Sequence, residues 1–187
     1  MKKILQKEAP VLRGISQNIP LESIGLPRLQ KIIKEMKEAL ASQDDGVALA
    51  APQIGYPLRI FVVSKKVEGI IKGDKGGEDK TIEAKDSVFI NPILKKISKE
   101  KKVVEEGCLS VRYLYGKVSR GNKAIISAWD EYGKKFERGG TGLLAQIFQH
   151  EMDHLDGILF IDKAKFVEEI LPKKPAQNKK NDNSSAH

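Results

Sequence analysis

The sequence predicts an α+β domain in which short antiparallel or mixed β-strands pack around one central helix late in the chain. Short β-rich runs separated by turn residues fill the middle of the chain, from residue 58 to residue 137. An amphipathic helix precedes them, and a second apolar-periodic segment, Leu143 to Leu155, follows them. With 187 residues and no internal repeat, the chain suits a single domain, 1–171, followed by a basic tail, 172–187.

The composition is typical of a globular protein outside the membrane, with 40% hydrophobic and 31% charged residues. No apolar run approaches the ~20 residues that a membrane helix needs. The amino-terminal MKKILQKEAPVL lacks the apolar centre of a secretory signal. The single cysteine, Cys108, excludes an intrachain disulfide and is compatible with a reducing compartment. We therefore expect a cytoplasmic location and no membrane contact.

The net charge of +8 and the pI of about 9.4 have two interpretations. A basic balance favours contact with nucleic acid, ribosomes or anionic surfaces, but a lysine-rich surface also serves solubility. No arginine stripe and no nucleic-acid motif accompany the charge. We expect no direct nucleic-acid specificity.

The first two elements are an arm and a helix. Prolines and glycines break up the short apolar pieces of residues 1–26, which predicts an irregular arm packed on the domain. Pro27 suits the first turn of a helix that should end near Ser42. The residues that form the apolar stripe of this helix are Leu29, Ile32, Ile33, Met36 and Leu40.

The middle of the chain predicts strands. Leu58 to Val63 is a continuous β-rich run, typical of a buried strand. Lys123 to Trp129 alternates as a half-buried strand does, and a turn at Asp130 to Gly133 leads back into Lys134 to Glu137, which predicts a hairpin. The other expected strands are 88–90, 93–97 and a short run at 103–104, and the expected surface loops or turns are 64–86 and 99–102.

The last third of the chain predicts a second helix and a tail. Residues 139–142 should loosen the chain before this helix, with Thr141 as its N-cap and Gly157 closing it. Val167 to Leu171 predicts a further short helix. The tail beyond it has almost no apolar residues and should be disordered or loosely held, so that His187 is too mobile to bind a metal.

The second helix carries an H-E-x-x-H motif in the run Gln149 to His154. Residues four apart return to nearly the same side of a helix, so His150 and His154 can bind one metal ion. Glu151 lies about 100° round the helix from His150, within reach of a water at such a site, as a general base would. The alternative is a chance match on a surface helix. The chain has only 3 histidines, so two at ligand spacing do not follow from abundance, and the apolar residues of the helix indicate that it is packed against the domain.

Two histidines leave a catalytic metal site one protein ligand short. The spacing of one protease class would place a third histidine at position 160, but that residue is Phe160, so this class is excluded. A downstream carboxylate, Glu168 or Glu169, is one candidate. The thiolate of Cys108 is the other, although a lone cysteine is also compatible with a small buried hydrophobe.

A run of small residues, 44–55, contains a single side-chain amide, Gln53. Such a run lets another backbone approach closely. A tight turn packed on the core and a substrate edge both explain it.

Three separated segments resemble the signature motifs of the peptide deformylase family. They are Gly46-Val47-Ala48-Leu49-Ala50-Ala51-Pro52-Gln53, Glu106-Gly107-Cys108-Leu109-Ser110 and Gln149-His150-Glu151-Met152-Asp153-His154, in the family's order and with similar spacing. The continuation, residues 156–162, is also similar, and the resemblance covers roughly residues 4 to 165. All three motifs in register are far more specific than any one of them.

The resemblance implies a metal-dependent amidohydrolase. Cys108, His150 and His154 would hold one divalent metal ion, most often Fe(II) in the family, with zinc, nickel or cobalt as substitutes. Glu151 would take the proton from a water and deliver it to the leaving amine, while Gln53 and the backbone N–H of Leu109 would stabilise the oxyanion. The substrate would be the N-formyl-methionyl end of a new polypeptide, and the products formate and a free amine.

The resemblance also implies how the substrate binds. The small residues around Gly46 and Ala48 would form an edge for an extended peptide, as in β-strand addition. Ile147 and the loop after Ser110 are candidates for the wall of the methionine pocket. Some bacterial relatives use their carboxyl-terminal segment to dock on the ribosome. Tail lysines that could contact RNA phosphates in this way are Lys173, Lys174, Lys179 and Lys180.

The sequence departs from the family's pattern at two places. Ala48 stands where the family commonly has a second glycine, and Arg112 stands where it often has proline. These changes concern substrate binding and leave the proposed ligands intact. Arg120 matches an arginine of the family, and a surface salt bridge is an adequate explanation for it.

Two other functions compete with deformylation. One is a metallopeptidase with Glu168 or Glu169 as third ligand. The other is a catalytically silent module that binds peptide ends. A silent relative would be expected to lose a ligand, Glu151 or Gln53, and this chain has all of them.

Overall fold

The computed structural model describes residues 1–72 and 85–172. Within these ranges the chain forms a small α+β domain with two antiparallel sheets, one of five strands in the order β1-β2-β3-β6-β7 and one of three in the order β4-β5-β8. The strands are β1 (Ala48–Ala50), β2 (Ile60–Val63), β3 (Ser87–Ile97), β4 (Lys101–Gly107), β5 (Leu114–Gly121), β6 (Lys123–Trp129), β7 (Lys135–Thr141) and β8 (Lys165–Glu169). The helices are α1 (Pro27–Ala41), α2 (Lys66–Lys72) and α3 (Leu143–Leu155), with short 3-10 turns at Pro10–Arg13, Leu21–Ser23, Ala51–Ile54 and Phe160–Asp162.

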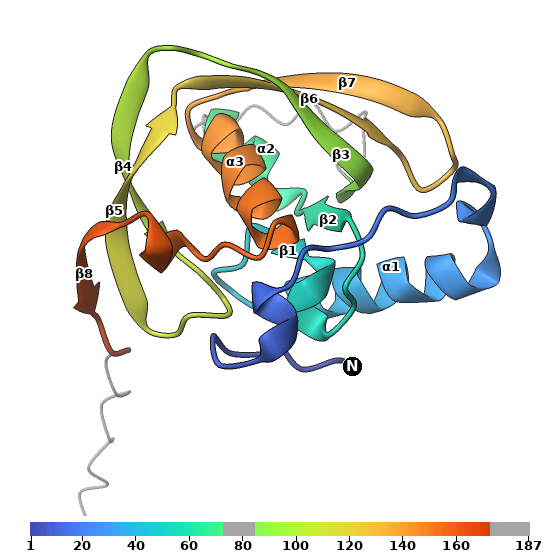
Figure 1. Cartoon of the computed structure of the whole chain (residues 1–187), viewed down its shortest axis with the longest axis horizontal. Coiled ribbons are helices and arrows are strands. Elements are labelled where there is room, and N and C mark those ends of the chain that lie inside the picture. Colours follow the sequence, from blue (N-terminus) through green and yellow to red (C-terminus); the bar gives the residue numbers. More distant parts are fainter. Residues whose placement is uncertain (73–84, 173–187) are drawn as a thin grey trace, which may run out of the picture.

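Helix α3 lies in the middle of the molecule, with β6 and β7 curving over it and the three-stranded sheet at one side (Figure 1). Helix α1 packs against the other face of the larger sheet. Strand β2 is covered on both faces. Ile60 and Val62 belong to the cluster around α1, and Phe61 and Val63 to the cluster around α3. This double burial explains why its sequence is apolar without alternation.

Aromatic packing fixes α3 against the sheet. The rings of Phe61 and Phe89 stack with centroids 4.5 Å apart, and Phe148 of α3 meets Phe89 edge-on at 5.5 Å. All three side chains are fully buried. Such pairs contribute about 0.5–1.5 kcal/mol beyond burial, so the helix that carries the histidines has a rigid base.

Several sequence predictions are confirmed. Helix α1 begins at Pro27 and ends at Ala41, β2 lies within the predicted run, and β6 has the predicted bounds and pairs with β7 as a hairpin. The arm, residues 1–26, is irregular apart from two 3-10 turns. Gly157 follows α3 with a φ of 75°, and a Cβ there would lie 2.7 Å from the carbonyl oxygen of Arg13, so glycine is required where the chain crosses the arm.

The predictions for residues 64–97 were partly wrong. Residues 66–72 form helix α2 instead of a loop, and residues 73–84 of the predicted loop lie outside the described residues. The two short strands expected at 88–97 are one strand, β3. Asn91, with a φ of 48°, stands where the register of β3 shifts. Its side-chain amide bonds both backbone groups of Ile19, so the arm stabilises a bulge where the sequence suggested a break.

The glycines before α3 are part of a strand, contrary to prediction. Strand β7 runs through Gly139 and Gly140 to Thr141, and the N-cap of α3 is Gly142, with no side-chain cap. A Cβ on Gly140 would lie 2.9 Å from the side chain of Leu144. These glycines therefore allow the first turn of α3 to lie directly against β7.

Three other segments differ from expectation. Lys101 and Lys102, predicted in a turn, begin β4, and β5 was not predicted. The helix predicted at 167–171 is wrong, because Lys165–Glu169 forms strand β8 and pairs with β5. The structure describes the chain as far as Pro172, so the rest of the tail that was predicted to be disordered, residues 173–187, lies outside the described residues. No helix in the described ranges is long and apolar enough to cross a membrane.

Candidate metal centre

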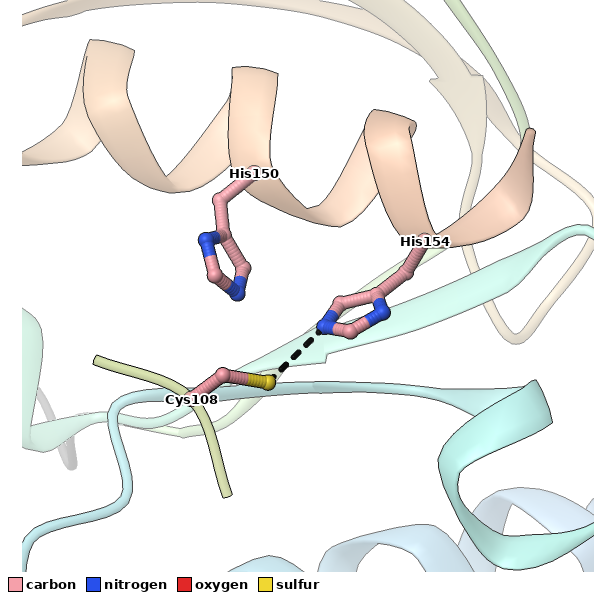
Figure 2. Close-up of side chains that lie close together, drawn as sticks. All are labelled: Cys108, His150 and His154. Carbon is pink, nitrogen blue, oxygen red and sulfur yellow. Dashed lines mark hydrogen bonds between the residues drawn. The ribbon is translucent and has the colours of Figure 1, made fainter. Parts of the chain in front are cut away.

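Cys108, His150 and His154 converge on one point of the structure (Figure 2). Each offers one ligand atom, and these atoms all lie within 4.8 Å of one another. The Cys108 Sγ and the His154 Nε2 are 3.1 Å apart. Glu168 and Glu169, the alternative third ligands, are exposed on β8 and do not belong to this group.

Local structure explains the convergence. His150 and His154 lie one turn apart on α3, as their spacing predicts, with ring centroids 4.9 Å apart. Cys108 directly follows β4, and its carbonyl accepts a 3.0 Å hydrogen bond from the Val111 N–H, which closes a turn. A Cβ on the preceding Gly107 would lie 2.7 Å from the Tyr115 ring, so only glycine allows β4 to approach β5 there.

This donor set fits a divalent transition metal. A thiolate and two imidazoles are ligands that iron, zinc, nickel and cobalt accept, and three protein ligands leave one position for water or substrate. The Glu106 carboxylate lies 3.0 Å from His150 Nδ1. Since a carboxylate can only accept, Nδ1–H donates, and Nε2 is the nitrogen left for the site.

Behind His150 lies a buried ionic network. Arg120 donates from Nε and Nη2 to both oxygens of Glu106, over 2.7 and 2.8 Å, and from Nη1 to Asp153 over 2.6 Å. Lys163 donates to the other oxygen of Asp153 over 2.6 Å. Arg120 is only 5% exposed, so its interpretation as part of a surface salt bridge was wrong. The network pairs two carboxylates with two cations and fixes the carboxylate that orients His150.

The surroundings perturb several pKa values. Burial tends to raise the pKa of Glu106, but hydrogen bonds from Arg120 and His150 lower it to about 2, so this carboxyl stays ionised. Burial is the main cause that raises the pKa of Glu151. The charge of Glu106 adds to the rise, His150 and Arg120 oppose it, and the pKa lies at about 7. Burial lowers the pKa of His154 well below its usual value. A carboxyl with a pKa near neutrality can both take up and release a proton.

Gln53 and Leu109 lie beside the three candidate ligands. Gln53 is 2% exposed, and its Oε1 accepts a 2.8 Å hydrogen bond from the Ala50 N–H. Its Nε2 is thereby directed to Ser110 Oγ at 3.1 Å and Cys108 Sγ at 3.6 Å. The Leu109 N–H, next in the chain after Cys108, has no acceptor among the described residues.

A cleft of about 300 Å³ opens in front of this group. Gly46 and Ala48 line it, together with Glu105 to Gly107 at the end of β4. Ile147 and the segment Val111 to Tyr115, the candidates for the methionine pocket, line the cleft as well. A Cβ on Gly46 would lie 2.9 Å from the Leu40 side chain, which explains glycine at this position.

Sequence reasoning missed several residues that support the group. Glu106 and Asp153 stood inside the quoted motifs, but neither was predicted to form a buried ion pair. Arg112 was identified only as a departure, yet it pairs with Asp45 at the edge of the cleft and with Gln43 Oε1 at 3.1 Å. Acidic residues in two motifs that should meet at one buried site were the available signal for a buried cation.

The sequence profile described as polypeptide deformylase matches residues 1–169. The chain belongs to this family. Its members are hydrolases that remove the N-formyl group from newly made polypeptides.

Individual relatives agree with the match. The chain is 43% identical to "Peptide deformylase 1A, chloroplastic" of Solanum lycopersicum over 169 residues, 87% of this chain and 59% of the relative. It is 37% identical to the peptide deformylase of Fusobacterium nucleatum, covering 95% of this chain and 92% of that one. The chain thus spans less than two thirds of the plant relative and most of the bacterial one.

Solved structures of the family have the same fold. A peptide deformylase from Legionella pneumophila superposes with a TM-score of 0.73 at 37% identity, covering 88% of this chain and 86% of that chain. A peptide deformylase from Synechococcus elongatus, in complex with actinonin, superposes with a TM-score of 0.72 at 30% identity, covering 88% of this chain and 79% of that chain. The predicted α+β fold and the predicted family are confirmed.

Proposed function

We propose that this chain removes the N-formyl group from the N-terminal methionine of newly synthesised polypeptides and releases formate. The observation that carries the proposal is the convergence of Cys108, His150 and His154 within 4.8 Å, beside a buried Glu151 and at the wall of a cleft. It occurs in a chain that matches the deformylase family over residues 1–169.

Cys108, His150 and His154 hold one divalent metal ion per chain in this proposal. Fe(II) is the metal we propose, and the same donors accept zinc, nickel or cobalt. When bound, the ion lowers the pKa of a water from 15.7 toward ~7 and polarises the formyl carbonyl. Glu106 orients His150 through the Nδ1–H contact of 3.0 Å.

Glu151 is the general base and then the general acid. It takes a proton from the water that attacks the formyl carbon and delivers one to the amine as the C–N bond breaks. Its Oε2 is buried and has no partner among the described residues, and burial raises its pKa to about 7. Both properties suit a group that exchanges a proton with substrate near neutral pH.

Gln53 Nε2 and the Leu109 N–H stabilise the negative charge that develops on the formyl oxygen. The bond from the Ala50 N–H to Gln53 Oε1 fixes the amide so that Nε2 points toward Cys108. One such donor can contribute ~10²–10³ in rate. This role accounts for a buried glutamine among small residues.

The cleft binds the substrate as an extended peptide. Gly46 and Ala48 on one wall, and the end of β4 on another, offer backbone groups to the substrate, so recognition depends little on the sequence after methionine. Ile147 and the loop after Ser110 line the methionine side chain. Ala48 is 7% exposed and packs in the cluster around α3, so its methyl group narrows the edge only slightly.

The two competing functions are not favoured. The peptidase needs Glu168 or Glu169 at the metal, but both are exposed on β8. The silent module would be expected to have lost part of the machinery, but all proposed ligands, Glu151 and Gln53 are present in the site.

The proposal also covers the domain bounds, the location and the tail of the chain. We assign residues 1–171 to the catalytic domain, and we place the protein in the cytoplasm. The basic tail, residues 172–187, docks on the ribosome through Lys173, Lys174, Lys179 and Lys180. Deleting the residues after Leu171 should weaken salt-sensitive co-sedimentation with ribosomes, and unchanged binding would remove this part of the proposal.

The reaction is tested with three peptides of one sequence, bearing an N-formyl-methionyl, N-acetyl-methionyl or free methionyl end. Protein purified without oxygen and loaded with Fe(II) should release formate and a new amine in equal amounts from the first peptide only. Cleavage of an internal peptide bond would favour the peptidase. Stoichiometric binding without any product would favour the silent module.

A further inference from the structure

The amino-terminal arm contacts both segments that we propose to bind the oxyanion. The Leu5 N–H donates to the Gln53 carbonyl over 2.8 Å. The next residue, Gln6, donates from Nε2 to the Leu109 carbonyl over 3.1 Å, across a sequence separation of 103 residues. Two consecutive arm residues therefore hold the backbones of the two proposed donors.

The Gln6 side chain makes a second contact with the same loop. Its Oε1 accepts a hydrogen bond from the Arg112 N–H at 3.3 Å, so one amide bridges Leu109 and Arg112. The Val111 N–H bonds the Cys108 carbonyl at 3.0 Å within this loop.

These bonds fix the direction of the Leu109 N–H. That N–H and the Cys108 carbonyl belong to one planar peptide unit, so the bond from Val111 orients this unit. Gln6 holds the next peptide unit through the Leu109 carbonyl, for which it is the sole donor in the described ranges. The backbone on both sides of Leu109 is thereby held.

An oxyanion donor works because it is aimed before the reaction begins, and a misplacement of about 1 Å can cost ~10²-fold in rate. Gln6 is exposed, so its side chain contributes little to the core. Its effect on the loop can therefore be separated from an effect on folding.

We infer that Gln6 is a positioning residue of the active site: its side-chain amide holds the loop Cys108 to Arg112 so that the Leu109 N–H points at the developing oxyanion. The inference rests on the proposed function. It assigns a role in catalysis to the arm, which lies outside all three motifs that carry the family resemblance.

The test compares two substitutions of Gln6 with a neighbouring control. Gln6→Met keeps the length of the side chain and removes both hydrogen bonds. Gln6→Glu keeps an acceptor for the Arg112 N–H but has no donor for the Leu109 carbonyl. Lys7→Ala is the control, because Lys7 is exposed and forms no ion pair with the described residues.

We expect both Gln6 variants to lower kcat for formate release by ~5–20-fold, a fraction of the ~10² that a full misplacement can cost. KM should stay within about two-fold, metal content at one ion per chain, and Tm within about 3 °C of wild type. Lys7→Ala should match wild type in every measurement.

A measurement that does not depend on turnover accompanies the kinetics. In the zinc-loaded protein, amide hydrogen exchange at Arg112 should accelerate in Gln6→Met but not in Gln6→Glu. The ¹⁵N order parameter of Leu109 should fall in both variants, because both lose the donor to its carbonyl.

The outcomes separate the two proposals. If the wild type releases formate and both Gln6 variants have the same kcat as the wild type, the role of Gln6 is overturned and the proposed function is not. A lower kcat accompanied by loss of metal, a large fall in Tm or an equal loss in Lys7→Ala would make Gln6 merely structural and overturn it too. No formate release by wild type would overturn the proposed function, and this inference with it.

Discussion

Two groups of buried polar atoms meet at His150, and they differ in whether their atoms have partners. Behind the histidine, Glu106 and Arg120 are held by hydrogen bonds of 2.6 to 3.0 Å that continue to Asp153. Beside it, Glu151 Oε2 and His154 Nδ1 are equally buried, yet neither has a partner among the described residues.

Under the proposed function, we infer from this difference which groups support the site and which react. A fully paired carboxylate such as Glu106, with its pKa lowered to about 2, keeps one charge state and one orientation. A buried carboxyl with an unpaired oxygen is costly, and its pKa near 7 leaves it ready to change charge. The protein tolerates this cost at Glu151, next to the candidate ligands.

The largest expected effect is on the metal itself. Cys108→Ser should weaken metal binding by at least ~10²-fold, since even the outer partners of ligands contribute ~10–100-fold, and formate release should be lost. Metal content after dialysis and formate release measure it. Glu168→Gln and Glu169→Gln are the controls and should behave as wild type. Full metal content in Cys108→Ser with loss in either glutamate variant would restore the peptidase.

The paired region should respond in stability. Arg120→Met leaves Glu106 without its cation and removes one of the two cations that pair with Asp153, so the free energy of unfolding should fall by ~3–5 kcal/mol. Urea unfolding of the metal-free protein measures the change. Adding Glu106→Gln to this variant should recover part of the loss. A change below about 1 kcal/mol would contradict a supporting role for the network.

The smallest effect is expected at an exposed pair. Asp162 accepts hydrogen bonds from Arg13 and the Leu159 N–H. Partial burial tends to raise the pKa of this carboxyl, but the two hydrogen bonds outweigh burial and lower the pKa below its ordinary value of 3.8. A carboxyl whose pKa is lower in the folded than in the unfolded state stabilises the fold at a pH above its unfolded-state pKa. That stabilisation is lost as the pH falls through its folded-state pKa. Asp162→Asn should therefore cost less than ~1 kcal/mol near neutral pH and nothing in strong acid. Thermal unfolding of the wild type and the variant, from neutral pH to strong acid, measures the difference in stability. An equal loss of stability at every pH would argue against the ion pair.

Local patterns predicted the parts of this molecule that depend on local geometry. The spacing of His150 and His154 determines that they share one side of α3, and the apolar stripe after Pro27 determines α1. The predictions failed where partners are distant in sequence. Strand β8 forms because it pairs with β5, which is distant in sequence, and Lys165–Glu169 has too few apolar residues to reveal a strand.

The supporting residues were hidden for the same reason. Arg120 binds Glu106 and Asp153, which lie 14 and 33 residues away, so its burial could not be read from its neighbours. The candidate metal ligands Cys108 and His150 come from different parts of the fold, and only the resemblance joined them before the fold was known.

The central claim is that Glu151, the unpaired carboxyl, performs the proton transfer. The most direct test is formate release by Fe(II)-loaded Glu151→Gln, with metal content measured on the same sample. We expect one metal ion per chain and a kcat at least ~10²-fold below wild type, as for other general bases. Turnover within about ten-fold of wild type, with the metal in place, would contradict the account.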